Sequence, residues 1–264
     1  MLCGRRMTET RRSPNQPAYS AFFEKEGVSQ EHFFEDEMHT FFVETMAVPG
    51  GMAELNSRER DHLFKTLRAR PGDAVELFDG CGGRMDGIVR DGRVVEILTA
   101  ERVPEPERKL FLYCAVPRRT KFDVLLKQAA ELGVWSIRLV ECVRSVAKPE
   151  GSDRWQLLLQ EGCKQSKNPF LPEIVPPVPL AAALEEIRAE EICAFFGAIR
   201  SGERGAEAAA KLAWIVGPEG GFTEEEEAAM RAAGVRGLNL GPYVLRLETA
   251  AVCGLAVLRQ WMEQ

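Results

Sequence analysis

Hydrophobic and polar positions follow two different patterns along this chain, and the first extends to about residue 103. Short runs rich in Val, Ile and Phe are separated there by turn residues, which predicts strands over residues 39–44, 73–79, 83–90 and 93–98. The Asp91-Gly92 pair between two such runs is a strong hairpin signal. A single short helix is expected over residues 57–67, with Ser57 as its N-cap. These features predict a small β-barrel.

The second pattern, an alternation of strands and helices, begins at residue 110. Apolar positions at helical spacing alternate with short β-rich runs, which is typical of an α/β domain with a mainly parallel sheet. The segment VPEPERK, with two prolines and four charged residues, is the expected linker, so we predict domains over residues 38–104 and 105–264. The expected strands cover residues 110–116, 136–141, 193–196, 213–216 and 238–240, and the expected helices cover residues 122–134, 154–167, 181–191, 223–234 and 248–262.

Residues 1–37 differ from the rest of the chain. They begin with a polar stretch rich in Arg, Thr, Ser and Asn and end in an acidic run, without the apolar segment of a secretion signal. We expect a disordered N-terminal extension, and Met38, directly before the first strand, is a candidate for the true start of the protein.

Composition narrows the class of protein. Of the 264 residues, 45% are hydrophobic and 28% are charged, which fits an ordinary globular protein with a sizeable core. No apolar run approaches the roughly 18 residues of a membrane span, so we expect no membrane segment. Seven scattered cysteines without a C-x-x-C pair are typical of free thiols in the cytoplasm, and only three histidines are present, so we expect no metal.

Charge is distributed unevenly along the chain. The net charge is −6, yet residues 58–127 hold 15 Lys and Arg against 12 Asp and Glu, a balance of +3. Residues 185–227 hold 4 Lys and Arg against 11 Asp and Glu, a balance of −7. A polyanion such as RNA is therefore expected to meet the first stretch rather than the second.

The stretch 214–234, WIVGPEGGFTEEEEAAMRAAG, is the most informative about chemistry. A strand ends, a glycine-rich turn follows, and Thr223 caps a helix with Glu226 at capping-box spacing. Glycines allow the main chain to approach a ligand closely, and the end of a strand in an α/β sheet is the usual ligand position. The alternative is a tight turn that binds nothing. A phosphate loop is not indicated, because no Lys-Ser/Thr follows and four Glu begin the helix.

A second stretch of this kind is LNLGPYVLRLETA, residues 238–250, which again combines a strand, a glycine-containing loop and a helix. Arg246 and Glu248 stand between two apolar runs, directly before the small-residue helix. They are either site residues or a plain ion pair at the helix start. Two ligand-type loops in one domain favour a site.

Four motifs in a fixed order carry a family resemblance: DHLFKTLRARPGD, ELGV with RWQLLLQEGCKQSKNPFLPEI, GPEGGFTEEE and LGPYVLRLETA. Together they resemble the bacterial 16S ribosomal RNA methyltransferases that modify a uridine at ring nitrogen 3. The resemblance covers residues 38–264. Tyr243 and Asn168 stand where the family often has arginine.

The resemblance implies a PUA-like β-barrel that helps to hold RNA, followed by a SPOUT-type α/β domain with a trefoil knot. It further implies the cofactor S-adenosyl-L-methionine, a homodimer, and 16S ribosomal RNA or the small ribosomal subunit as partner. By matching position, the cofactor contacts would come from Phe196, Gly197, Gly217, Pro218, Glu219, Gly220, Gly221, Leu240, Gly241, Val244, Leu245 and Arg246.

Methyl transfer to a uracil nitrogen requires alignment of donor and acceptor and removal of a proton. Glu248 is the candidate base, Arg246 the candidate for stabilising a uracil oxygen or the cofactor carboxylate, and Gln165 a candidate contact to the base edge. Each has an alternative role as an orienting or solvated residue. The candidate RNA-binding residues are His62, Arg68, Arg70, Lys121, Lys164 and Lys167.

Two other functions stay open from the sequence. One is a non-catalytic RNA-binding or ribosome-assembly protein with the same fold. The other is a nucleotide-dependent transferase that uses the glycine-rich turn on a phosphate.

Overall fold

The structure, a computed structural model, describes residues 38–90, 94–117, 119–146, 153–198 and 209–263. The predicted extension over residues 1–37 and the Asp91-Gly92 turn lie outside these ranges. The chain divides into two compact units. One contains the chain up to Leu77 together with Arg84–Glu101, and the other contains Phe78–Gly83 and the chain from Arg102 onward.

The first unit is built on a five-stranded sheet in the order β1-β3-β4-β5-β2. All four predicted strands are present, and their alternating apolar side chains form a core that includes Phe41, Leu77, Met85 and Val95. The short β2 pairs with β5 in antiparallel orientation. The strand bounds are β1 His39–Phe42, β2 Met52–Ala53, β3 Ala74–Phe78, β4 Gly83–Arg90 and β5 Val94–Arg102.

The predicted helix of this unit differs from the observed one in its cap and its shape. It consists of α3, Ser57–Asp61, continued by the π-helical turn η1, His62–Thr66. The prediction of Ser57 as N-cap is wrong, because Asn56 has the extended conformation of a cap and its side chain accepts a hydrogen bond from the Glu59 N–H at 2.9 Å. Ser57 is already helical.

The second unit contains a six-stranded sheet in the order β11-β9-β10-β6-β7-β8, and every neighbouring pair is parallel. This confirms the predicted parallel sheet. The strand bounds are β6 Lys109–Ala115, β7 Ser136–Glu141, β8 Glu173–Pro179, β9 Cys193–Gly197, β10 Lys211–Val216 and β11 Arg236–Leu238.

Two strands of this parallel sheet depart from the sequence prediction. The proline-rich passage 173–179 forms β8, which was not expected. It lies at the edge of the sheet, where a missing N–H is tolerated, and its register with β7 shifts between Arg138 and Val140. At the other edge, β11 ends at Leu238, where the predicted strand 238–240 begins.

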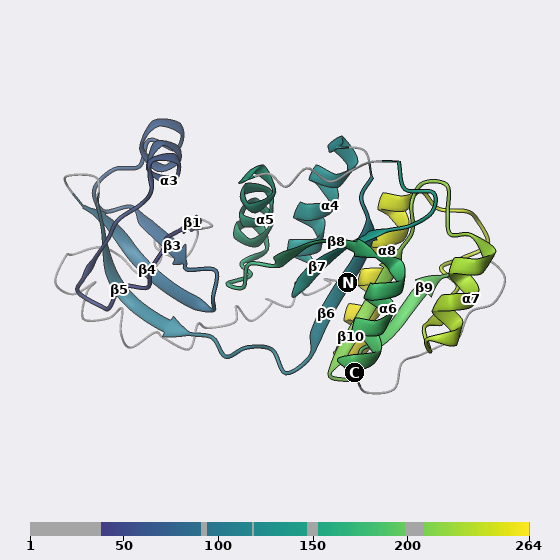
Figure 1. Cartoon of the computed structure of the whole chain (residues 1–264). Coiled ribbons are helices and arrows are strands. Elements are labelled where there is room, and N and C mark those ends of the chain that lie inside the picture. Colours follow the sequence, from purple (N-terminus) through teal and green to yellow (C-terminus); the bar gives the residue numbers. More distant parts are fainter. Residues whose placement is uncertain (1–37, 91–93, 118, 147–152, 199–208, 264) are drawn as a thin grey trace, which may run out of the picture. The chain divides into compact units, whose positions relative to one another are not determined.

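Helices cover both faces of the parallel sheet (Figure 1). The helices α6, Leu180–Ala189, and α7, Glu224–Ala232, pack on one face in a core with Phe111, Tyr113 and Ile215. The helices α4, Arg119–Glu131, α5, Asp153–Ser166, and α8, Leu247–Met262, form the layer on the other face. None of the helices in the described part of the chain is long and apolar enough to cross a membrane.

Candidate functional site

A cavity of about 960 Å³ opens at the carboxyl ends of β9, β10 and β11. It is lined by both glycine-bearing loops predicted from the sequence, although their glycines Gly217 and Gly241 are separated by more than twenty residues. The predicted cofactor residues that line it are Gly197, Gly217, Pro218, Glu219, Gly220, Gly221, Leu240, Gly241, Val244, Leu245 and Arg246. This is the crevice position in which open α/β sheets bind ligands.

The first loop, residues 217–222, depends on its glycines for shape. A side chain at Gly217 would bring its Cβ within 2.9 Å of the Phe222 ring. Gly221 has φ +71°, and its N–H donates to the carbonyl of Pro218 at 2.8 Å, which closes a tight turn. The loop is thus a compact wall of main chain.

The helix that follows the loop begins with the predicted capping box. The Thr223 hydroxyl accepts from the Glu226 N–H at 3.2 Å, and the Glu226 carboxylate accepts from the Thr223 N–H at 2.8 Å. The hydrogen bonds at this helix start lower the pKa of Glu225 from its ordinary value, chiefly through the backbone N–H and then through Thr223. The capping box therefore fixes the end of the first loop.

Arg144, which follows β7, holds the same loop from the other side. Its Nη1 donates to the carbonyls of Gly220 at 2.8 Å and Phe222 at 3.2 Å. The Glu226 carboxylate in turn accepts from the N–H of Val143 at 2.8 Å. Sequence reasoning missed Arg144, and no motif marks it, because its partners are main-chain carbonyls about eighty residues away.

The second loop connects β11 to α8. Gly241 has φ +138°, and its N–H donates to the side-chain oxygen of Asn239 at 2.7 Å. Tyr243 and Val244 are 82% and 78% exposed, which is unusual for apolar side chains of this size. Arg246 is the N-cap of α8 without a side-chain hydrogen bond to the helix, so the first amides of α8 receive no side-chain acceptor there.

Lys121, from the first turns of α4, links the two loops. Its Nζ lies 2.8 Å from Glu219 Oε1 in the first loop and 3.4 Å from Glu248 Oε2 in the first turn of α8. The hydrogen bond with Glu219, followed by the charges of both carboxylates, raises the pKa of Lys121 above its ordinary value. The ammonium is therefore fully charged at neutral pH.

The other predicted site residues have different positions. The Phe196 side chain is fully buried in the core and makes an edge contact with the Phe222 ring, whereas its neighbour Gly197 lines the cavity. Gln165 is exposed near the end of α5. Its neighbour Asn168 donates to the carbonyl of Ala130, near the end of α4, so Gln165 lies at the opposite end of α4 from Lys121.

The predicted RNA-binding residues fall into three groups. His62, Arg68 and Arg70 are exposed in the first unit. Lys164 and Lys167 are half-buried at the end of α5, and Lys121 belongs to the cavity.

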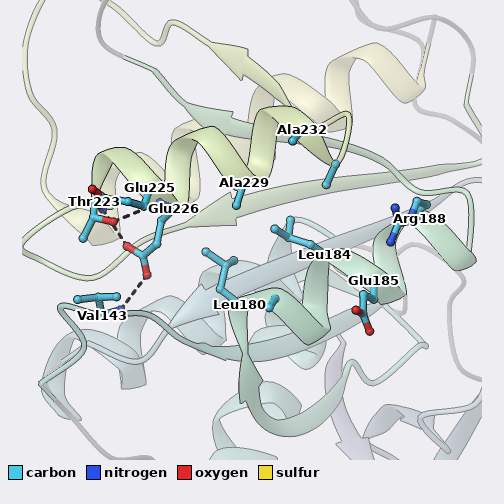
Figure 2. Close-up of a pocket in the computed structure, with 12 residues that line it drawn as sticks. Val143, Leu180, Leu184, Glu185, Arg188, Thr223, Glu225, Glu226, Ala229 and Ala232 are labelled. Carbon is cyan, nitrogen blue, oxygen red and sulfur yellow. Dashed lines mark hydrogen bonds between the residues drawn. The ribbon is translucent and has the colours of Figure 1, made fainter.

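A second, more apolar groove of about 640 Å³ lies between α6 and α7 (Figure 2). Leu180, Leu184 and Ala229 line its middle, while Glu226 at one end is already bonded to Thr223 and Val143. It lacks the glycine-bearing loops. The cavity between the loops is thus the better candidate for chemistry. Within the described ranges, no cluster of three or more His, Cys, Asp or Glu is suited to a metal ion.

Comparison with known proteins assigns a family. The sequence profile of the RNA methyltransferase domain matches residues 104–259, which includes both loops of the cavity. The chain belongs to this family. The family resemblance that the four motifs predicted is therefore confirmed.

Relatives of similar length support this assignment. Ribosomal RNA small subunit methyltransferase E of Aquifex aeolicus is 32% identical over 241 residues, covering 84% of this chain and 99% of the relative. The crystal structure of the enzyme of that name from Neisseria gonorrhoeae, bound to S-adenosyl methionine, has a TM-score of 0.77 at 26% identity and covers 85% of this chain and 98% of its own. A methyltransferase from Legionella pneumophila in complex with the same cofactor has a TM-score of 0.75 at 25% identity, covering 85% of this chain and 98% of its own. These similarities confirm the predicted fold class, a SPOUT-type α/β domain preceded by a small β domain.

Proposed function

We propose that this protein transfers a methyl group from S-adenosylmethionine to ring nitrogen 3 of a uridine in 16S ribosomal RNA. The observation that carries the proposal is the single cavity formed by two distant glycine-bearing loops in a chain of the RNA methyltransferase family. The relatives named above carry the name of a small-subunit ribosomal RNA methyltransferase, and two related structures hold this cofactor.

The residues of the cavity fit the cofactor. Its volume of about 960 Å³ lies within the range of small-molecule sites, and its walls combine apolar side chains such as Leu240 and Leu245 with glycine main chain. The apolar walls suit the adenine ring, and the exposed main chain offers donors and acceptors for the ribose and the methionine part. The cofactor supplies an activated methyl group on a positively charged sulfur.

Glu248 and Arg246 are the proposed chemical groups of the protein. When the new bond to uracil nitrogen 3 forms and the carbon–sulfur bond breaks, the proton on that nitrogen must leave. The Glu248 Oε2 atom is buried and, apart from the Lys121 ammonium at 3.4 Å, has no polar partner in the described structure, so we propose it as the acceptor of this proton. Arg246 lines the cavity and supplies a positive charge for a uracil oxygen or the cofactor carboxylate.

We propose that RNA is bound by the first domain, residues 38–104, and by basic residues of the second domain. His62, Arg68 and Arg70 are exposed and follow one another along a short segment, and Lys164 and Lys167 add charge at the end of α5. Positive charge that contacts phosphates makes affinity fall steeply with salt. Gln165 stands beside Lys164 at an exposed position, from which it would contact a splayed base edge.

A homodimer is part of the proposal. Tyr243 and Val244 of the second loop and Val146 after β7 are strongly exposed apolar side chains. Tyr243 and Val244 line the cavity, and exposed apolar side chains of this kind are typical of an interface, so covering them would close the cavity toward water. The proposed substrate is assembled in the cytoplasm, which is the location we infer for the protein.

The test uses purified protein, radiolabelled S-adenosylmethionine and small-subunit RNA. We expect methyl incorporation that maps to one uridine and is reduced at least about a hundredfold by Glu248→Gln, since general-base catalysis typically contributes this much. Mass mapping of small-subunit RNA from cells lacking the gene should show the loss of one 3-methyluridine. Absence of incorporation into both free RNA and assembled subunits would instead favour a non-catalytic assembly protein.

A further inference from the structure

We propose that Lys121 is a positioning residue of the methyl-transfer site, where it joins the two cofactor loops, and that it is not a phosphate contact for RNA. This inference rests on the proposed function. It gives Lys121 a different role from the sequence prediction, which placed this residue among the RNA contacts. It is carried by the contacts of one ammonium group.

Lys121 connects three segments that are distant in sequence. Its Nζ reaches Glu219 Oε1 at 2.8 Å, across 98 residues, and Glu248 Oε2 at 3.4 Å. Glu219 belongs to the first loop and Glu248 to the start of α8, directly after the second loop. A single side chain on the rigid helix α4 therefore holds one residue at each of the two loops.

Of the two contacts of Lys121, the one with Glu248 is expected to be more sensitive to loss of the ammonium than the one with Glu219. The Glu248 Oε2 atom is buried and accepts no hydrogen bond in the described structure. The Glu248 side chain as a whole is 25% exposed, so without the Lys121 charge it is expected to turn its buried oxygen toward water. This movement displaces the proposed proton acceptor and the first turn of α8.

The charge balance argues against an RNA contact. Lys121 contributes one positive charge, and Glu219 and Glu248 contribute two negative charges, so the cluster carries −1. A phosphate that approached Lys121 would meet both carboxylates, and such a cluster offers no net attraction.

The inference separates the binding of cofactor from the binding of RNA. Lys121→Met should weaken the affinity for S-adenosylmethionine by about tenfold in the absence of RNA, a change of about 1.4 kcal/mol. It should leave the affinity for small-subunit RNA and the salt dependence of that affinity unchanged. Lys121→Arg, which can still bridge two carboxylates, should restore most of the cofactor affinity.

A matched control lies on the same helix. Lys127 forms an ion pair of 2.6 Å with Glu161 and is not among the residues of the cavity, so Lys127→Met should change neither affinity. In addition, the double variant Lys121→Met/Glu219→Gln should bind the cofactor no more weakly than Lys121→Met, because both changes remove the same link. Glu219→Gln alone gives the same test if Lys121→Met does not fold.

Calorimetric titration with the cofactor and RNA binding at several salt concentrations distinguish the outcomes. The inference would be overturned in favour of a phosphate contact if Lys121→Met kept its cofactor affinity but bound RNA more weakly. In that case the slope of log RNA affinity against log salt concentration would be smaller by about one. Strictly additive effects of the two changes would also overturn the inference. Failure of the unchanged protein to bind the cofactor would instead refute the proposed function.

Discussion

At the scale of single residues, a glycine on α8 decides how closely that helix packs on the sheet. Gly254 lies on the Trp214 side chain of β10, and a Cβ at this position would overlap with the indole ring. The ring cannot easily move away, because it is fully buried and its Nε1 donates to the carbonyl of Ala250 at 3.0 Å. Trp214 also lines the cavity, so the contact supports the site.

Gly254→Ala is therefore expected to destabilise the protein. The gain in helix propensity is about 1 kcal/mol, whereas overpacking of this kind costs about 1–3 kcal/mol and more against a fixed ring. We predict a net loss of about 1–2 kcal/mol in the free energy of unfolding, measured by urea denaturation. Cys253→Ala, at an exposed position of the same helix, is the control and should change little. Equal or greater stability of Gly254→Ala would contradict this packing argument.

Single residues also show what the sequence could not reveal. The glycines of both loops could be identified from the sequence, because the turns that they form depend on neighbouring residues alone. The contacts of Arg144 and Lys121 depend on partners that are distant in sequence, and neither contact follows from any local pattern. The predicted contact of Gln165 with the edge of the base stays a prediction for the same reason.

At the scale of elements, the predictions succeeded where local chemistry decides the structure. The capping box at the start of α7 follows from the capping residues, and the five predicted helices of the second unit follow from helical periodicity. The strand β8 was missed because its three prolines argue against a strand, and only its edge position makes them tolerable.

The capping box gives a prediction for α7. Thr223→Ala removes the acceptor of the Glu226 N–H and should lower the free energy of unfolding by about 1 kcal/mol. Because the box fixes the end of the first loop, the affinity for S-adenosylmethionine should fall as well, as measured by calorimetry. Thr223→Ser keeps a hydroxyl and should preserve both quantities. A full loss in Thr223→Ser would show that the methyl group, not the cap, is responsible.

At the scale of the whole molecule, burial of thiols links stability to pH. Burial raises the pKa of Cys114, Cys142 and Cys163 from the ordinary value of 9.0 to about 12. Folding thus favours the protonated thiol. Below pH 9 the thiols are protonated in both states, and between pH 9 and 12 only the unfolded state loses the proton, so stability falls as pH rises through this window.

The expected loss is about 1 kcal/mol for each of these thiols at pH 10 relative to pH 8. Urea denaturation at a series of pH values measures it. Cys163→Ala removes one of these contributions, so the stability of this variant should decline less steeply above pH 9 than that of the unchanged protein. A decline of equal steepness in both proteins would exclude the thiol as the cause.

The architecture of the whole molecule was predictable only in part. Periodicity indicates a parallel sheet. The strand order β11-β9-β10-β6-β7-β8, however, depends on the crossover connections between strands, which no local sequence pattern predicts. The family resemblance supplied the SPOUT-type fold, and the profile match and related structures confirmed it. The joining of two loops into one cavity is a property of that topology.

The central claim is that these two loops form one binding site for S-adenosylmethionine. Isothermal titration calorimetry of the purified protein with this molecule and, separately, with ATP tests it most directly. We predict a saturable heat with S-adenosylmethionine that is strongly reduced by Gly217→Val in the first loop and by Gly241→Val in the second, and no heat with ATP, because four glutamates begin α7 beside the cavity. Absence of heat with S-adenosylmethionine, or binding that either loop variant leaves intact, would contradict the account.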